Sequence, residues 1–502
     1  TNAGIGWHRG FFYGAAGAQT TNQGFFGSHH ARRAAPPIED RMSYQSFVAR
    51  KMSLVQPSGI AGGFSLHGSL FQHQSALTSW ALRRGRAAIF ADTGMGKMRM
   101  EMCWADAVRK HTKRPVIVHT PLAVAPQIAA EAKKIGIDAR VIRDGSQVWE
   151  GINVINYDRL HKINPADFGG VVLDESGCIK HAETQAFKAL TEAYRDTPFK
   201  LPATATPAPN DWTELGTHAE FLGICTKAEM LAEFFMHDGG DTSAWRLKGH
   251  ARAAFWRWVS SWGAMIRKPS DLGFDDGAYN LPPLHLHEHL VGVERAIEGH
   301  LFAMEAQTLS ERRDARRMSL AERVQACADR VNAESAEPWV VWCDLNAEGD
   351  ALTDAIPGAV QIAGSDSVEV KEQRLQDFAE GRIRVLVSKP SICGWGLNWQ
   401  HSARMAFVGV TDSYEAYYQA VRRCWRFGQT RPVHVHLFAS KAEGAVVSNL
   451  RRKEADAAAM AESLSAETRE SVLSEVRGLT RQTNEYNAAS RVQLPGFLRT
   501  AA

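Results

Sequence analysis

Short apolar runs alternate with helix-like segments along the first half of the chain. Between about residues 68 and 225, four runs consist mainly of small and β-branched apolar residues, which is typical of buried parallel strands. Each run is followed by a turn and then by a segment with helical spacing, and this order predicts a doubly wound α/β domain. The four predicted strands are Ala87–Phe90, Pro115–Val118, Val154–Ile155 and Val171–Leu173.

The same alternation returns after about residue 336 and predicts a second lobe of the same kind. Between the two lobes, residues 226–335 have a helical pattern rich in tryptophan. We expect a helical insertion there, with its tryptophans in a core rather than on a base-stacking surface. The fold class is therefore α/β, with parallel-sheet lobes at 42–225 and 336–450. The strands predicted in the second lobe are Trp339–Trp342, Ala359–Ile362, Val385–Val387, Met405–Val408 and Val433–Leu437.

The two ends of the chain differ from these lobes. Residues 1–41 are rich in Gly, Ala, Thr and Asn and carry little periodic apolar surface. Such a segment cannot offset the entropy of ordering, so we expect disorder or a non-native extension, with Met42 as a candidate natural start. Residues 451–502 are rich in Ala, Glu and Arg and predict a helical tail.

Composition narrows the class of protein. A chain of 502 residues with 44% apolar and 23% charged residues is typical of a globular protein with two or three domains. The net charge is only +3, so any DNA site must be a local basic groove. Seven scattered cysteines suit neither zinc nor a disulfide framework. We therefore expect a cytoplasmic protein, and no apolar run approaches the roughly 18 residues of a membrane span.

A glycine-rich turn follows the first predicted strand. It reads Ala-Asp-Thr-Gly-Met-Gly-Lys-Met at 91–98 and leads into a helical segment. The backbone N–H groups of such a loop can wrap phosphates, the helix N-terminus adds its dipole, and Lys97 can reach the β and γ phosphates. We therefore predict that ATP is bound by Asp92, Thr93, Gly94, Met95, Gly96, Lys97 and Met98.

The residue after Lys97 departs from the usual loop. A Ser or Thr at that position normally holds Mg²⁺ through its hydroxyl group, whereas Met98 has no oxygen. Either the metal is held through water and by acidic residues, or hydrolysis is impaired. The second possibility leaves open another class of protein, a nucleotide-gated DNA-binding clamp or scaffold that hydrolyses ATP weakly or not at all.

Two carboxylates follow the predicted strand Val171–Leu173. Ligands of open α/β sheets bind at the carboxyl ends of the strands, which is where Asp174 and Glu175 stand. We predict that Asp174 binds Mg²⁺ and that Glu175 polarises the water that attacks the γ phosphate. The segment Thr204–Pro207 offers hydroxyl groups that can connect this acidic pair to the second lobe.

Taken in order, these segments resemble the Swi/Snf-like branch of superfamily-two helicases, in the compact form found in bacteriophages and prophages. The resemblance runs from about Met42 to Leu450. It implies two RecA-like lobes that share one ATP, in a DNA-dependent ATPase of a bacterial or phage-infected cell, with Gln74 reading adenine. The segments that carry it are Phe71–Gln74, Asp92–Lys97, Thr120–Leu122, Asp174–Ser176, Thr204–Pro207, Gly394–Asn398 and Gln419–Gln429.

The last of these segments implies a role for the second lobe. Arg423 and Arg426 are three residues apart and therefore lie on one side of a helical turn. A guanidinium group aimed at the γ phosphate stabilises transition-state charge and is worth roughly 10³ to 10⁵ in rate. Gln419 is expected to orient this cluster, and Gly396 to let the backbone approach ATP or DNA closely. Arg422 stands where many members of the family carry Gly.

The resemblance also implies a DNA path. Thr120 belongs to a DNA-contact motif, and Lys180, Lys389 and the basic run 312–317 are further candidates. Family likeness favours movement along duplex DNA over strand separation. An RNA helicase remains an alternative. Against it, the acidic motif reads Asp-Glu-Ser rather than DEAD, and the arginine motif ends in Arg-Phe-Gly-Gln, as in the double-strand DNA branch.

Overall fold

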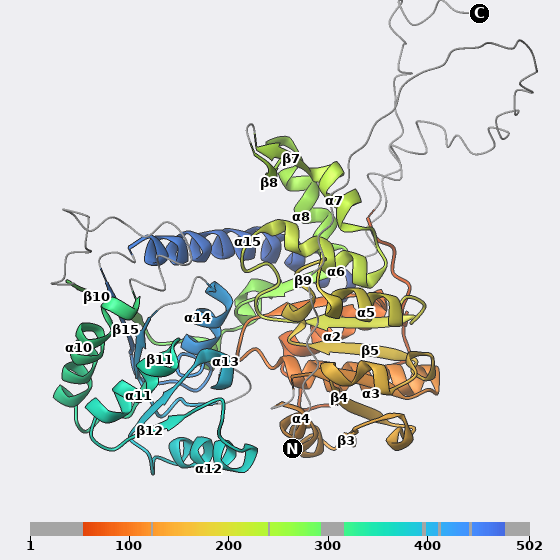
Figure 1. Cartoon of the computed structure of the whole chain (residues 1–502). Helices are drawn as coiled ribbons and strands as arrows, with labels where there is room; N and C mark the ends of the chain where they lie inside the picture. Colours follow the sequence, from red (N-terminus) through yellow and green to blue (C-terminus); the bar gives the residue numbers. More distant parts are fainter. Residues whose placement is uncertain are drawn as a thin grey trace, which may run out of the picture. The chain divides into compact units, whose positions relative to one another are not determined.

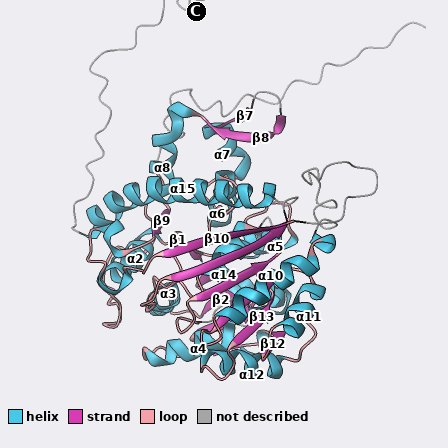
Figure 2. Ribbon diagram, turned by 90° about the vertical axis from the view of Figure 1, so that its left-hand side faces the viewer, coloured by secondary structure: helices cyan, strands magenta, loops and turns pink. Residues whose placement is uncertain are grey.

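Two fully parallel sheets, each flanked by helices, form the framework of the protein (Figures 1 and 2). The predicted pair of parallel α/β lobes in tandem is confirmed. The expectations for residues 1–41, for Gly396 and for most of the basic run 312–317 lie outside the described residues. The computed structural model describes residues 54–121, 124–238, 241–292, 316–393, 398–409, 413–440 and 444–476.

The first sheet has seven strands in the order β3-β4-β2-β5-β6-β1-β9. Every neighbouring pair is parallel, which requires crossover connections that cover the faces of the sheet. Its strands are β1 Ala88–Ala91, β2 Val116–Thr120, β3 Ala139–Val141, β4 Ile152–Asn156, β5 Gly170–Asp174, β6 Phe199–Ala203 and β9 Gly263–Ile266. The helices of this part are α2 Gln72–Arg84, α3 Lys97–Thr112, α4 Ala125–Lys134, α5 Gln185–Ala193, α6 Leu215–Leu222, α7 Lys227–Phe234 and α8 Arg252–Ser260.

The second sheet has six strands in the order β10-β15-β14-β11-β13-β12, again all parallel. Its strands are β10 Leu284–Val291, β11 Trp339–Cys343, β12 Ala359–Ile362, β13 Val385–Ser388, β14 Arg404–Val408 and β15 Val433–Ser440. The helices that follow it in sequence or separate its strands are α10 Leu320–Ala333, α11 Asn346–Ala355, α12 Val368–Ala379, α13 Pro390–Cys393, α14 Tyr414–Val421 and α15 Gly444–Val476. None of the described helices is long and apolar enough to cross a membrane.

Each sheet buries both of its faces, as the continuous apolar runs predict. In β5, Val172 packs into one core cluster of the first lobe, and Val171 and Leu173 pack into the other. In β11 of the second lobe, Trp342 and Trp339 likewise point into different clusters. Alternate side chains of one strand therefore serve two cores, because successive side chains of a strand point to opposite faces.

Residues 226–335, which were expected to form a helical insertion, form strands as well as helices. They form α7, α8 and an antiparallel hairpin, β7 Phe235–Asp238 and β8 Asp241–Leu247, but they also contribute a strand to each sheet. Strand β9 pairs with β1, and β10 pairs with β15 along its whole length. The sheets therefore extend past the predicted boundaries at 225 and 336. A four-residue strand such as β9 is too short to show a periodic pattern.

The tryptophans of this segment pack as core, as predicted. Trp262 and Trp256 are buried, and Trp245 and Trp258 are partly buried against the same apolar cluster of the first lobe. Trp258 and Trp262 meet edge to face with their ring centroids 5.4 Å apart. Such large rings bury the apolar surface that holds α8 against the sheet.

Helix α15 connects the cores of the two lobes (Figure 1, blue). Near its start, Leu450 belongs to a core cluster of the second lobe. Further along, Met460 and Leu464 belong to a cluster of the first lobe, and the hydroxyl of Thr468 accepts a hydrogen bond of 3.1 Å from the backbone N–H of Met265 in edge strand β9. The described part of the predicted helical tail therefore covers a sheet edge and contacts both lobes, and the expectation for residues 477–502 lies outside the described residues.

Lys200 is buried in the middle of strand β6, which the sequence did not predict because Lys and Pro interrupt its apolar run. Its ammonium group donates to the backbone carbonyl oxygens of Phe221, at 2.9 Å, and Arg195, at 3.3 Å. Burial, with a smaller contribution from Arg86, lowers the pKa of Lys200 to about 8.

This shift makes a testable contribution to stability. A lysine with a folded-state pKa near 8 and an unfolded-state pKa near 10.5 binds fewer protons in the folded state between those values. The free energy of unfolding should therefore rise with pH from about 8 upward. Lys200→Met should remove this rise, so urea unfolding of both proteins at pH 7.5 and 9.5 tests it. Equal pH dependence of the two proteins would contradict it.

Candidate active site

The phosphate loop forms between strand β1 and helix α3, as the sequence predicts. Gly94 has φ +94° and Gly96 has φ +84°, in the left-handed region that side chains rarely adopt. Gly96 stands at the N-cap of α3, so the first N–H groups of that helix face the loop. The loop therefore has the backbone conformation and the helix end that a phosphate needs.

Lys97 connects the loop with the acidic motif. Its ammonium nitrogen donates to the carbonyl oxygen of Ala91 at 3.2 Å and lies 3.7 Å from Oε1 of Glu175. The cation of the loop and the carboxylate at the end of β5 thus meet in one site. Two segments that are far apart in sequence are brought together because β1 and β5 both pair with β6.

Gln74, expected to read adenine, holds the loop in this structure. Its side-chain nitrogen donates to the carbonyl oxygen of Met95 at 3.0 Å, and its side-chain oxygen accepts from the N–H of Phe71 at 3.1 Å. The side chain is buried, and a Cβ atom at Gly96 would overlap its amide group. The glycine at 96 is therefore required by the close approach of Gln74 as well as by its positive φ.

Asp174 and Glu175 stand at the carboxyl end of β5. Asp174 is buried, and burial together with the neighbouring Glu175 raises its pKa to about 7. The hydroxyl of Tyr157 donates to the backbone carbonyl of Asp174 at 2.7 Å. Glu175 has φ +52°, a strained conformation for a residue with a side chain, and strain of this kind is concentrated at functional sites.

Thr120 lies inside the site in this structure, and its expected role on DNA stays a prediction. It was expected to contact DNA, but it is fully buried and its hydroxyl donates to Oδ2 of Asp174 at 2.8 Å. The reason is topological: β2 and β5 are neighbours in the sheet, so the last residue of β2 lies beside the last residue of β5. Thr120 therefore orients the carboxylate and is inaccessible to a DNA backbone in this structure.

The two arginines of the second lobe lie at the phosphate loop. A Cβ atom at Gly94 would be 3.2 Å from the backbone nitrogen of Phe427 and 3.9 Å from Cβ of Arg426. Burial and the neighbouring Arg426 lower the pKa of Arg423 to about 9, while the charge of Glu175 acts in the opposite direction. Burial and Arg422 lower the pKa of Arg426 to about 10. Residues from both lobes thus form one electrostatic cluster.

Gln419 lies in the same cluster, in helix α14. Its side chain is buried, and its amide nitrogen has no hydrogen-bond partner among the described residues. A buried donor without a partner is unfavourable, so it marks a place where a ligand oxygen would accept a hydrogen bond from this N–H group.

Arg422, which stands where the resembled family often has Gly, bridges the two lobes. Its Nη2 donates to the carbonyl oxygen of Thr93 at 2.6 Å and lies 2.9 Å from Oδ2 of Asp92. The hydroxyl of Tyr418 donates to the other carboxylate oxygen of Asp92. Sequence analysis missed Tyr418, because one tyrosine on a helix carries no signal. The phosphate loop is therefore tied to α14 and the turn that follows it.

Removing this bridge should open the lobes. Breaking a buried ion pair by removing one partner costs about 3 kcal/mol, which corresponds to roughly a hundredfold shift between closed and open forms. Arg422→Ala should therefore increase the radius of gyration of the nucleotide-free protein in small-angle X-ray scattering. Arg431→Ala, which removes an exposed ion pair with Glu337 in the same lobe, is the control. Identical scattering from Arg422→Ala and wild type would exclude the bridge.

The lysines expected to contact DNA have different surroundings. Lys180 forms an ion pair with Glu415 of the second lobe, and Glu415 also accepts a weak hydrogen bond of 3.5 Å from Thr206 in the hydroxyl motif. Lys389 is partly buried directly after β13. Lys180 therefore contributes to the contact between lobes in this structure, and its role on DNA stays a prediction.

The donor set fits ATP and Mg²⁺. Lys97 is accompanied by three carboxylates, Glu101, Asp174 and Glu175, whose charges interact with one another. This excess of buried acid is what a divalent cation would neutralise. No group of three or more His, Cys, Asp or Glu among the described residues is arranged to hold a metal alone. Mg²⁺ usually takes one or two carboxylates together with substrate phosphates.

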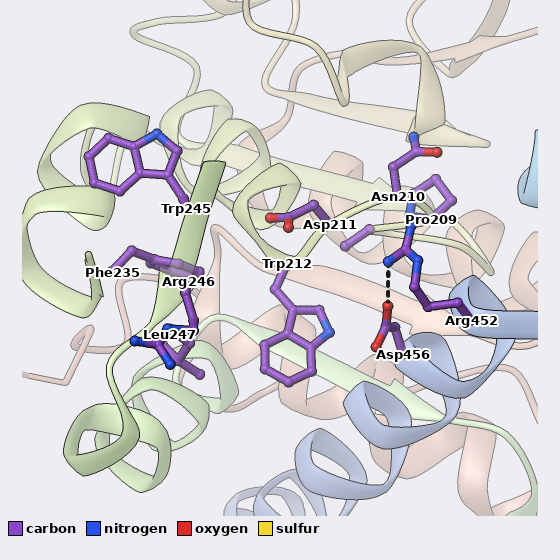
Figure 3. Close-up of a pocket in the computed structure, with 11 residues that line it drawn as sticks. Pro209, Asn210, Asp211, Trp212, Phe235, Trp245, Arg246, Leu247, Arg452 and Asp456 are labelled. Carbon is purple, nitrogen blue, oxygen red and sulfur yellow. Dashed lines mark hydrogen bonds and ion pairs between the residues drawn. The ribbon is translucent and has the colours of Figure 1, made fainter. Parts of the chain in front are cut away.

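A separate pocket of about 180 Å³ lies next to the hairpin β7–β8 (Figure 3). Trp212 lies near its centre, and Arg452 and Asp456 of α15 form an ion pair at its edge. None of the predicted nucleotide-binding residues lines it. The pocket is therefore distinct from the site at the phosphate loop.

Comparison with models of known protein families finds a match in the second lobe. Residues 334–428 match the family model described as helicase conserved C-terminal domain. The second lobe is thus helicase-like, from just before β11 to the end of the arginine motif. A search of curated proteins found no significant match.

Among solved structures, the chain is similar to the SWI2/SNF2 ATPase core of Sulfolobus solfataricus in complex with double-stranded DNA. The sequence identity is 16%, the TM-score is 0.38, and the alignment covers 85% of this chain and 98% of that chain. A likeness at this level does not identify a function.

Proposed function

We propose that the chain is an ATP-dependent DNA translocase of the compact, phage-type Swi/Snf-like branch, working in the cytoplasm. The observation that carries the proposal is the meeting of both lobes at one site. Lys97 and Glu175 come from the first lobe, whereas Arg422, which pairs with Asp92 of the phosphate loop, and Arg426, beside Gly94, come from the helicase-like second lobe. A shared nucleotide at such a site would make lobe movement depend on hydrolysis.

In this proposal, each residue has a distinct task. Gly94 and Gly96 shape the backbone around the phosphates, and Lys97 neutralises their charge. Asp174, held by Thr120, would bind the magnesium ion, which would neutralise charge on the phosphate oxygens. Glu175 orients and polarises water.

The second lobe completes the site. Arg423 and Arg426 stabilise the charge that develops in the transition state, and they do so only when the lobes are closed. Hydrolysis then removes the contact that holds the lobes together. The phosphate grips of the two lobes move relative to each other, and the protein steps along DNA.

The decisive experiment measures ATP hydrolysis by the whole chain with and without nucleic acid. We expect duplex DNA to stimulate hydrolysis more strongly than single-stranded DNA or RNA. Lys97→Ala should abolish the rate in every condition. Binding of ATP without stimulation by any nucleic acid would exclude the motor, and stronger stimulation by RNA would favour an RNA helicase.

Met98 supports a second candidate, a nucleotide-gated DNA clamp. Its side chain packs against the core of the first lobe and provides no oxygen for the metal. The two candidates differ in the effect of Met98→Thr. A rise from almost no hydrolysis to a substantial rate would favour the clamp, whereas a wild-type rate that is already high and changes little would favour the motor.

A further inference from the structure

A buried carboxylate lies one helical turn beyond the phosphate-loop lysine. Glu101 is in helix α3, four residues after Lys97, so the two side chains leave the helix on the same face. It is 0% exposed, and both of its carboxylate oxygens lack a hydrogen-bond partner among the described residues. No motif drew attention to this residue.

The position is an unfavourable one for an acid. Its neighbours in the helix, Met100 and Met102, are buried apolar residues, and an apolar side chain at 101 would avoid the loss of hydration. Burial, and then the charge of Asp174, raises the pKa of Glu101 well above its ordinary value. A buried acid without a hydrogen-bond partner, next to the acidic motif, therefore indicates that its partner is a ligand that binds at this site.

The phosphate loop lacks the hydroxyl oxygen that usually follows its lysine, because Met98 stands directly after Lys97. Met98 cannot provide it, and its partly buried side chain packs into the core. Glu101 is the acid of α3 that interacts electrostatically with Lys97, Asp174 and Glu175. It follows Met98 by three residues in α3, so the two side chains leave neighbouring positions of one helix face.

We propose that Glu101 replaces the missing hydroxyl group and, together with Asp174, would hold nucleotide-bound Mg²⁺. This inference rests on the proposed function, because it assumes that the phosphate loop binds a nucleotide with its metal. A cation between these acids would relieve the mutual repulsion of Glu101, Asp174 and Glu175. The metal site is thus rebuilt with a carboxylate rather than lost with the hydroxyl.

The test measures binding of the fluorescent nucleotide mant-ADP to the whole chain as MgCl₂ is varied, with no turnover. Glu101→Gln should raise, at least tenfold, the Mg²⁺ concentration that gives half of the full increase in mant-ADP affinity. Its affinity for mant-ADP in EDTA should stay within twofold of wild type. Asp106→Asn, which changes another acid of the same helix, is the matched control and should behave as wild type. Adding Met98→Thr to Glu101→Gln should restore most of the Mg²⁺ dependence.

A second variant separates a metal-binding role from a structural one. Glu101→Met should raise the melting temperature of the ligand-free protein, because it removes an unpaired buried acid, and should also weaken the Mg²⁺ dependence. If Glu101 served the fold alone, Glu101→Met would lower the melting temperature and leave the Mg²⁺ dependence unchanged.

The outcomes for this inference and for the proposed function are distinct. A wild-type protein that binds mant-ADP neither in MgCl₂ nor in EDTA would overturn the nucleotide site itself, whereas binding that does not depend on Mg²⁺ would overturn only the metal site. Wild-type Mg²⁺ dependence that Glu101→Gln leaves intact would overturn only the role of Glu101. If Glu101→Gln weakened mant-ADP binding equally in EDTA and in MgCl₂, Glu101 would stabilise the fold of the phosphate loop rather than hold the metal.

Discussion

Arg426→Ala is expected to lower DNA-stimulated ATP hydrolysis by about 10³-fold or more, and Arg423→Ala by a similar factor. Both side chains come from the second lobe, yet Arg426 lies beside the phosphate loop and Arg423 is coupled to Glu175. Their charge would be needed when negative charge develops on the transferred phosphoryl group. Because their site is buried, water would screen that interaction little.

The measurement is steady-state hydrolysis with saturating duplex DNA, together with the affinity for mant-ADP. Arg431→Ala, an exposed arginine of the same lobe, should retain the wild-type rate. Nucleotide affinity should change far less than the rate, because the arginines act mainly on the transition state. A loss of less than tenfold in both arginine variants would remove these side chains from the chemistry.

Glu175→Gln is expected to lower the rate of hydrolysis by about 10² to 10⁴-fold while nucleotide binding persists. The amide keeps the size of the side chain but cannot accept a proton from water. Lys97, 3.7 Å from the Glu175 carboxylate, would lose an ionic partner, so affinity for the negatively charged nucleotide should stay equal or increase.

The test for Glu175 pairs single-turnover hydrolysis with DNA binding in the presence of ATP. Glu192→Gln, which removes an exposed acid paired with Arg195, provides a control of the same chemical change. If the water were oriented by another group, Glu175→Gln would hydrolyse ATP at close to the wild-type rate. Asp174 would then be the first residue to examine in its place.

Most of the strands confirmed in the structure have a continuous apolar run, whereas β12 and β15 are interrupted by Gln361 and by His434 and His436. Val171–Leu173 and Trp339–Trp342 were predicted because parallel strands buried on both faces need such runs. Strands β6 and β10 were missed for physical reasons. Lys200 is tolerated in β6 because carbonyl oxygens of other segments accept hydrogen bonds from its ammonium group.

Strand β10 alternates leucine and histidine, and its histidines find partners only across the sheet. His287 and His434 approach to 3.0 Å between ring nitrogens, and His289 and His436 approach to 2.9 Å. This register with β15 comes from a segment almost 150 residues away in sequence. No local pattern can carry that information.

In the candidate active site too, some residues are predicted by local motifs, whereas the contacts of others depend on the fold. The sequence identified Lys97, Asp174 and Glu175 because their motifs are local: a glycine loop between a strand and a helix, and two acids at a strand end. It assigned Thr120 to DNA because its motif resembled a contact motif. The neighbouring positions of β2 and β5 place that hydroxyl on Asp174.

By itself the sequence determined the class of fold and the local chemistry of the phosphate loop, because backbone conformation and apolar periodicity are properties of neighbouring residues. Only the tertiary structure decided what the isolated polar residues do. Arg422 bridges the lobes, and Glu101 is buried without a partner beside Asp174. Burial and charge pairing depend on segments that meet only after folding, so no spacing along the chain encodes them.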